Sequence, residues 1–285
     1  MTTALKRLLK MNNTVKRSLS GVLFLGVVLA GLLINKYLFA LLFIFMEVCM
    51  LAEFYKMTMG DRYPKSRLFA IFIAVLTFCI IFSIYSFHIP IKFTAVIALA
   101  LVGLMSSSLF VNDKEDFHLF SNLYTGLFYI AIPLGFSNLI VFDAQGNFSG
   151  ILMVCFFCII WASDVGAYCF GLLFGKNGKK LCPSISPKKS WAGFWGGLLS
   201  AILVSVILKL TGLFPHPMVH CLILAIIMDV AGVFGDLFES QWKRISGIKD
   251  SGSIIPGHGG MLDRFDSTIF AIPAGTAYLA ILGLL

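Results

Sequence analysis

Long apolar runs separated by short polar connections make up most of the chain. Runs of membrane length lie at nine places: residues 19–35, 37–58, 68–87, 91–111, 119–142, 150–175, 191–213, 216–238 and 267–285. Each run is close to the roughly 20 residues that an α-helix needs to cross the hydrocarbon core of a bilayer. The pattern therefore predicts an all-α integral membrane protein, a polytopic bundle of about nine transmembrane helices. The first two runs are so close that we expect a tight hairpin between them.

The composition excludes a soluble globular domain. Of the 285 residues, 59% are hydrophobic and only 13% are charged, and a soluble fold of this length could not bury that much apolar surface. The chain has no internal repeat and no flexible linker, so we expect one compact bundle. We divide it into residues 1–87 with the first three helices, residues 88–142 with the next two, and residues 143–285 with the last four.

The basic residues predict how the chain is oriented in the membrane. Five of them precede the first span and indicate a cytoplasmic amino terminus: Lys6, Arg7, Lys10, Lys16 and Arg17. With nine spans, the terminus and the connections on the same side hold 19 of the 22 Lys and Arg residues, that is, all but Lys36, Lys92 and Lys209. The formal net charge of +8 therefore reflects orientation and attraction to anionic lipid, and it indicates no nucleic acid partner.

Five acidic residues fall inside the predicted spans: Glu47, Asp164, Asp229, Asp236 and Glu239. A charged residue at the centre of a membrane helix costs about 2.5–3.5 kcal/mol, so we expect each acid to be neutral, paired or facing a polar cavity. For Glu47 and Asp229, a packing role and a functional role are both open. Asp164 shares a helix face with Tyr168, and Asp236 shares one with Asp229 and Glu239, which favours a polar cavity inside the bundle.

A first polar segment, GKNGKKLCPSISPKKSW, covers residues 175–191 and contains five lysines. One interpretation is a cytoplasmic loop that only sets orientation. The other is a phosphate-binding segment, in which lysines supply charge while serine hydroxyls and backbone N–H groups supply direction.

A second polar segment, from Ser240 to Ser267, is the densest in charge. Lys243, Arg244 and Lys249 lie near Asp250, and residues 257–260 read Gly-His-Gly-Gly just before a predicted helix, a pattern suited to anion binding by N–H groups. Asp263 and Asp266 are three residues apart and point the same way on a helix. Carboxylates beside many cations fit a divalent cation such as Mg²⁺ together with a polyphosphate, as in phosphoryl or nucleotidyl transfer. The chain has no Walker loop and no dinucleotide-binding glycine motif.

These residues resemble a known family. The string Ser240-x-x-Lys243-Arg244-x₄-Lys249-Asp250, followed by Pro256-x-His258-Gly259-Gly260-x-x-Asp263-Arg264-x-Asp266, is similar to the signature of CDP-diacylglycerol synthases, also called phosphatidate cytidylyltransferases, and closest to the bacterial branch. Three further stretches resemble the family in the expected order: Asp164-x-x-Ala167-Tyr168, Gly175-Lys176 and Ser186-Pro187-Lys188-Lys189-Ser190. Arg17–Gly21 and Glu53-Phe54-Tyr55 do so more weakly.

The resemblance implies an enzyme that transfers CMP from CTP to phosphatidic acid, giving CDP-diacylglycerol and pyrophosphate for phospholipid biosynthesis. It implies a multi-pass homodimer in the bacterial inner membrane, in contact with membrane lipid, with its active site facing the cytoplasm. The CTP and metal site would lie in residues 143–285.

The resemblance also implies roles for individual residues. The metal ligands would be Asp236 and Asp263, with Mg²⁺ as the expected ion, and a K⁺ ion beside it stays open. The expected catalytic residues are Lys243, Arg244, Lys249, Asp250, His258, Arg264 and Asp266, with His258 as a hydrogen-bonding or structural group rather than a base. The expected substrate-binding residues are Asp164, Tyr168, Lys176, Ser186, Lys188, Lys189, Ser190, Ser240, Gly259 and Gly260. The chain departs from many relatives at Ala192, where they carry Glu.

Two other functions share parts of this pattern. Acids within two spans are also typical of proton- or cation-coupled transporters, although here the polar residues gather on one side of the membrane. A CTP-dependent polyprenol or phytol kinase would share the nucleotide and the membrane, but not the full second segment.

Overall fold

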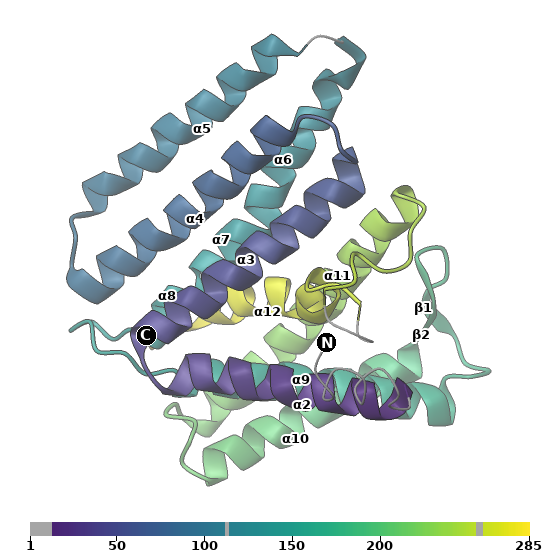
Figure 1. The fold of residues 1–285 in the computed structure, drawn as a ribbon. Coiled ribbons are helices and arrows are strands. Elements are labelled where there is room, and N and C mark those ends of the chain that lie inside the picture. Colours follow the sequence, from purple (N-terminus) through teal and green to yellow (C-terminus); the bar gives the residue numbers. More distant parts are fainter. Residues whose placement is uncertain (1–12, 112–113, 255–258) are drawn as a thin grey trace, which may run out of the picture.

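The computed structural model describes residues 13–111, 114–254 and 259–285, which form a bundle of helices (Figure 1). Within these residues, seven helical segments are long and apolar enough to cross a membrane. The prediction of an all-α polytopic membrane protein is confirmed. His258, one of the expected catalytic residues, lies outside the described residues.

The first helices follow the predicted spans closely. They are α2 (Asn13–Leu33), α3 (Lys36–Met59), α4 (Pro64–Phe87), and a fourth segment made of η1 (Ile91–Thr94), α5 (Ala95–Ser107) and η2 (Ser108–Phe110). Only two residues join α2 to α3, and the Asn35 side chain caps α3 by accepting the N–H groups of Tyr37 and Leu38. Of α5, only Leu104 is buried, and Figure 1 shows this helix at the edge of the bundle. The exposed apolar side chains of α5 suit contact with lipid.

The fifth predicted span is interrupted rather than a single regular helix. It is built from η3 (Lys114–Leu119), α6 (Phe120–Gly126), the π-helical turn η4 (Leu127–Ala131), α7 (Ile132–Gly135) and α8 (Ser137–Val141). Pro133 lacks an N–H to donate, and the wider turn before it accommodates the break. Most of this span is buried, so neighbouring protein surrounds its irregular backbone, as a membrane interior requires.

The last four helices are α9 (Ile151–Phe174), α10 (Trp191–Leu210), α11 (Met218–Ile245) and α12 (Leu262–Ile281). Glycines let α9 and α10 pack closely, because a Cβ at Gly166 would overlap Ser200 and a Cβ at Gly196 would overlap Phe170. Such small-residue contacts are typical of membrane helix pairs.

The structure corrects two predicted boundaries. The span expected to end at residue 238 continues as helix to Ile245, and the one expected to begin at 267 starts at Leu262. Three charged residues in these extensions, Glu239, Lys243 and Asp263, form ion pairs with one another, so the helices need not end where the apolar sequence ends. The hydropathy of the sequence marks the apolar core of a helix and not its true end.

The first polar segment is not only a loop. It contains a small antiparallel pair of strands, β1 (Lys180–Cys182) and β2 (Ser186–Ser190), which lies between α9 and α10 in sequence. The β2 strand runs directly into α10, whose amino terminus is capped by the Ser190 hydroxyl accepting the N–H of Gly193 at 3.1 Å. The two strands thus determine the positions of Lys180, Lys188 and Lys189.

Helix α12 connects the parts of the bundle. It packs on α11 and α9 from the last part of the chain, and also on α3, α7 and α8. The division at residues 87 and 142 therefore stays a prediction drawn from the sequence.

Candidate active site

Three helices bring acidic side chains together in one region of the bundle that is partly open at Asp164 and Asp236. Asp164 from α9, Asp236 from α11 and Asp266 from α12 lie close enough for their charges to interact. Ser267 joins two of them, because its hydroxyl contacts Asp164 Oδ1 at 3.4 Å and its N–H contacts Asp266 Oδ1 at 2.7 Å. Two further α11 residues belong to the same group, which we call the acidic centre: Asp164, Asp229, Asp236, Glu239 and Asp266.

The β2 strand places the side chain of Lys189 beside the acidic centre. Lys189 Nζ forms an ion pair with Asp236 Oδ2 at 2.5 Å, and both side chains are about a quarter exposed, at 25% and 29%. Among the residues that the structure describes, the other oxygen, Asp236 Oδ1, receives only a long contact of 3.3 Å from the Ser240 hydroxyl. Asp236 is therefore a partly exposed carboxylate beside a partly exposed cation, an arrangement that suits the binding of a cation and a phosphate.

A second lysine is buried between two acids. Lys243 is 9% exposed and pairs with Glu239, one turn earlier on α11, and with Asp263 Oδ1 at 2.9 Å. Glu239 is fully buried. This three-residue group joins the end of α11 to the start of α12, and it explains why both helices extend into the polar segment.

The loop before α12 wraps around Asp263. Asp263 Oδ2 accepts the Ser251 N–H at 2.9 Å, the Ser251 hydroxyl at 3.0 Å and the Gly260 N–H at 2.8 Å. Gly259 makes this turn with φ of 83°, a conformation that favours glycine. We expected the Gly259-Gly260 backbone to bind a substrate anion; in this structure the anion it holds is the Asp263 carboxylate.

Sequence analysis missed Ser163 and Tyr129 in this region, left the role of Asp229 open and noted Glu53 only weakly. Asp229 accepts the Ser163 hydroxyl, and the Tyr129 hydroxyl is buried within reach of the charges of Glu239 and Asp266. Glu53, from α3, accepts the N–H groups of Met261 and Leu262. Glu53 stood in a stretch with a weak family resemblance, which was the only signal for it in the sequence.

Several predicted residues lie at the same end of the bundle without a described contact to the acidic centre. The exposed ones are Tyr168, Lys176, Lys188, Lys249 and Asp250. Arg244 donates to the carbonyl of Ile185 at 3.2 Å and so ties the β hairpin to α11. Ser186 pairs with Cys182 in the hairpin, and Ser190 caps α10. Their substrate contacts stay predictions.

The donor set fits a hard divalent cation. Within the described residues, no three His, Cys, Asp or Glu side chains converge as a complete metal site. Magnesium usually takes only one or two carboxylates, and waters and phosphate oxygens fill the rest of its shell. The acidic centre holds more carboxylates than lysines, and Asp229 Oδ2 and Glu239 Oε1 make no hydrogen bond within the described part of the chain. Buried carboxylate oxygens without a hydrogen-bond donor, beside partly exposed carboxylates, fit a bound cation.

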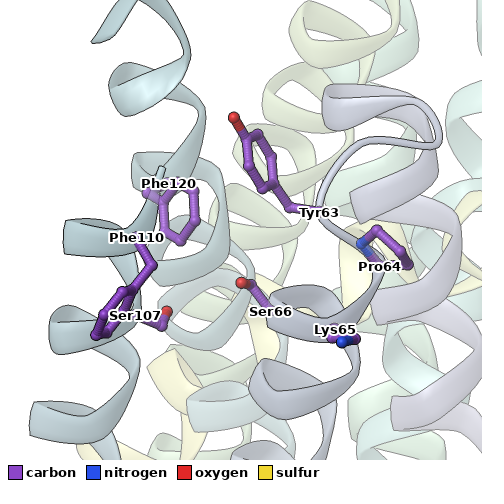
Figure 2. Close-up of a pocket in the computed structure, with 7 residues that line it drawn as sticks. All are labelled: Tyr63, Pro64, Lys65, Ser66, Ser107, Phe110 and Phe120. Carbon is purple, nitrogen blue, oxygen red and sulfur yellow. The ribbon is translucent and has the colours of Figure 1, made fainter. Parts of the chain in front are cut away.

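A separate cavity of about 420 Å³ lies between α4, α5 and α6 (Figure 2). Tyr63, Pro64, Lys65, Ser66, Ser107, Phe110 and Phe120 line it. None of them belongs to the acidic centre or to the predicted site, so we do not place the reaction there.

Comparison with known proteins assigns the family. The sequence pattern of the Cytidylyltransferase family matches residues 15–282, almost the entire chain. The chain belongs to this family. The resemblance inferred from the second polar segment is therefore confirmed.

Curated relatives of this cytidylyltransferase-family protein are bacterial phosphatidate cytidylyltransferases. The one from Bacillus subtilis is 44% identical over 125 residues, which is 44% of this chain and 46% of the relative. That from Staphylococcus saprophyticus is 48% identical over 117 residues, 41% of this chain and 44% of the relative. That from Rickettsia bellii is 39% identical over 157 residues, 53% and 66% of the two chains. The matched segment thus spans less than half of the first two relatives.

Proposed function

We propose that this cytidylyltransferase-family protein transfers CMP from CTP to phosphatidic acid, giving CDP-diacylglycerol and pyrophosphate. The observation that carries the proposal is the acidic centre, a group of carboxylates from the three helices α9, α11 and α12 with Lys189 at its edge. The family and the printed names of the relatives support the same reaction. A lipid substrate in the bilayer and a nucleotide from water could meet at such a site.

Asp236 of the acidic centre would hold a Mg²⁺ ion together with Asp263, whose Oδ1 would then be shared between the ion and Lys243. When bound, the ion supplies positive charge to the CTP triphosphate. Lys243, which contacts Asp263, would keep that carboxylate ionised and oriented. A K⁺ ion beside the first metal stays open, and the further carboxylates of the acidic centre offer ligands of the right kind.

The chain's own cations would balance the charge of the reacting phosphates. An oxygen of the phosphatidate phosphate attacks the α-phosphorus of CTP, the bond from that phosphorus to the bridging oxygen of the β-phosphate breaks, and pyrophosphate leaves. Lys189 is placed to move from Asp236 to a phosphate oxygen when the nucleotide arrives, and Lys188 and Lys176 add charge nearby. The phosphate nucleophile is already ionised near neutral pH, so the reaction needs no strong general base.

We further propose that the enzyme is a homodimer of the bacterial inner membrane, with the acidic centre open to the cytoplasm and to lipid. Two segments rich in basic residues, the β hairpin and the end of α11, lie side by side, since Arg244 contacts the carbonyl of Ile185. This supports a single cytoplasmic face.

The reaction is tested by the fate of labelled CTP. Purified protein is supplied with γ-labelled CTP, phosphatidic acid and Mg²⁺, and each component is omitted in turn. We expect labelled pyrophosphate and a CDP-lipid only when all three are present. Asp236→Asn should abolish turnover, while Asp143→Asn, an exposed acid in a different loop, is the matched control.

Two other results would contradict the proposal. Transfer of the label to a lipid alcohol without pyrophosphate would indicate a CTP-dependent kinase. The lack of any turnover with any divalent metal, together with cation flux in vesicles, would indicate a transporter.

A further inference from the structure

Glu53 on α3 reaches across the bundle to the start of α12. Its side chain is 7% exposed. Oε1 accepts the N–H of Met261 at 3.0 Å, and Oε2 accepts the N–H of Leu262 at 2.9 Å. Met261, at the N-cap position, provides no side-chain cap of its own. Glu53 therefore caps α12 from another helix, where a carboxylate satisfies free N–H groups and interacts favourably with the helix dipole.

The same carboxylate shares a hydroxyl group with Asp263. The Ser251 oxygen lies 3.2 Å from Glu53 Oε2 and 3.0 Å from Asp263 Oδ2. A serine hydroxyl has one proton, so the two carboxylates compete for it or share it. The position of Glu53 is thus linked through one side chain to that of Asp263.

The loop backbone closes around the Glu53 carboxylate. A Cβ at Gly252 would overlap Glu53 Oε1, and a Cβ at Gly260 would overlap Glu53 Oε2 and the Ser251 hydroxyl. Two glycines from the two sides of the loop therefore leave space for this one side chain. A carboxylate enclosed in this way fixes the loop more firmly than a surface contact would.

We propose that Glu53 is a positioning residue, which sets the orientation of the Asp263 carboxylate by fixing the loop and the first turn of α12. This inference rests on the proposed function, in which Asp263 holds Mg²⁺. Loss of the outer contacts that orient a metal ligand typically lowers metal affinity or activity 10–100-fold. Glu53 itself touches neither substrate nor metal in this proposal.

The test replaces Glu53 by glutamine. Glu53→Gln keeps the size of the side chain, but its amide nitrogen cannot accept a hydrogen bond from an N–H group. We expect the Mg²⁺ concentration for half-maximal CDP-lipid formation to rise about tenfold, with the KM for CTP unchanged at saturating Mg²⁺. The matched control is Glu47→Gln, on the same helix, where a fully buried carboxylate makes no hydrogen bond within the described residues. It should leave the Mg²⁺ dependence unchanged.

Two measurements do not depend on turnover. Hydrogen–deuterium exchange should be faster in Glu53→Gln over residues 251–254 and 259–265 and unchanged in α9 and α10. Binding of Mn²⁺ to the purified protein, followed by EPR spectroscopy, should weaken about tenfold. These results would support the role of Glu53 in metal binding even if the wild-type protein formed no CDP-lipid, an outcome that would overturn only the proposed reaction.

Two outcomes would overturn the positioning role. One is a variant whose exchange and metal binding match those of the wild type. The other is faster exchange with unchanged Mn²⁺ affinity and Mg²⁺ dependence, which would leave Glu53 as a structural contact alone. Glu53→Ala leaves two helix N–H groups without a partner and serves only to measure the loss of stability.

Discussion

Lys189 forms an ion pair with Asp236, so it would compete with a metal ion for that carboxylate. The Lys189→Met substitution removes the side chain that competes with the metal ion for Asp236. It also removes a positive charge that would stabilise the phosphates of CTP during the reaction. We predict that turnover falls about 100-fold, the size of effect seen when one group that stabilises a transition state is lost, while Mn²⁺ binding to the free protein becomes tighter. Steady-state kinetics and EPR titration measure the two effects.

A matched variant separates Lys189 from the general charge of its segment. Lys179→Met removes an exposed lysine of the same segment and should change neither quantity. Slower turnover with weaker metal binding in Lys189→Met would show that the ion pair supports the metal site instead of competing with it.

Lys243 allows a test of stability at the scale of a residue. It is buried against Glu239 and Asp263, and removing one partner of a buried ion pair costs about 3–5 kcal/mol because the other charge stays unpaired. We predict that Lys243→Met markedly lowers the unfolding temperature of the purified protein in detergent. The double variant Lys243→Met with Glu239→Gln should regain part of the loss, since one uncompensated charge is gone. Equal unfolding temperatures for the wild type and the single variant would show that this buried ion pair does not stabilise the protein.

At the scale of an element, the α9–α10 pair depends on glycine. A Cβ at Gly196 would overlap the Phe170 side chain of α9, and overpacking of this kind costs about 1–3 kcal/mol. We predict that Gly196→Ala lowers the unfolding temperature. Gly26→Ala, at a helical glycine with no atom near the added Cβ, should have no effect or raise it, because alanine favours helix by up to about 1 kcal/mol over glycine. Thermal unfolding of both variants in the same detergent makes the comparison, and equal shifts would contradict the close packing.

Elements show what the sequence could predict and what it could not. Hydropathy located the spans because each long apolar run has few alternatives to a membrane helix. It ended α11 at residue 238, since charges such as Glu239 and Lys243 break the apolar run although they neutralise each other in the fold. The β hairpin was missed because its two strands, of three and five residues, have no alternation of apolar and polar positions.

Most of the residues that the sequence singled out for the candidate site lie close together in the chain. Asp263 and Asp266 stand in one short string, and Asp236 lies only one helix earlier, so their chemistry was visible in the pattern. Glu53 contacts Leu262 across 209 positions, and no local pattern reports such a contact. Asp263 was expected as a metal ligand, but its hydrogen bonds to the loop depend on a turn that only the three-dimensional structure reveals.

At the scale of the whole molecule, the distribution of charge predicts which face meets the cytoplasm. Ser184, between β1 and β2, and Gln145, in the turn before α9, are both exposed. By the predicted topology, the first lies inside the cell and the second outside. We predict that, in a variant without the seven native cysteines, Gln145→Cys reacts with a membrane-impermeant maleimide in intact spheroplasts. Ser184→Cys should react only after the membrane is opened.

Labelling of Ser184→Cys but not of Gln145→Cys in sealed spheroplasts would show the reverse orientation, with the acidic centre away from cytoplasmic CTP. Labelling of both variants from outside would favour a pathway across the membrane. The arrangement of basic residues argues for the first pattern, because the hairpin that carries Ser184 also carries Lys189, whose ion pair with Asp236 brings the acidic centre to the same face.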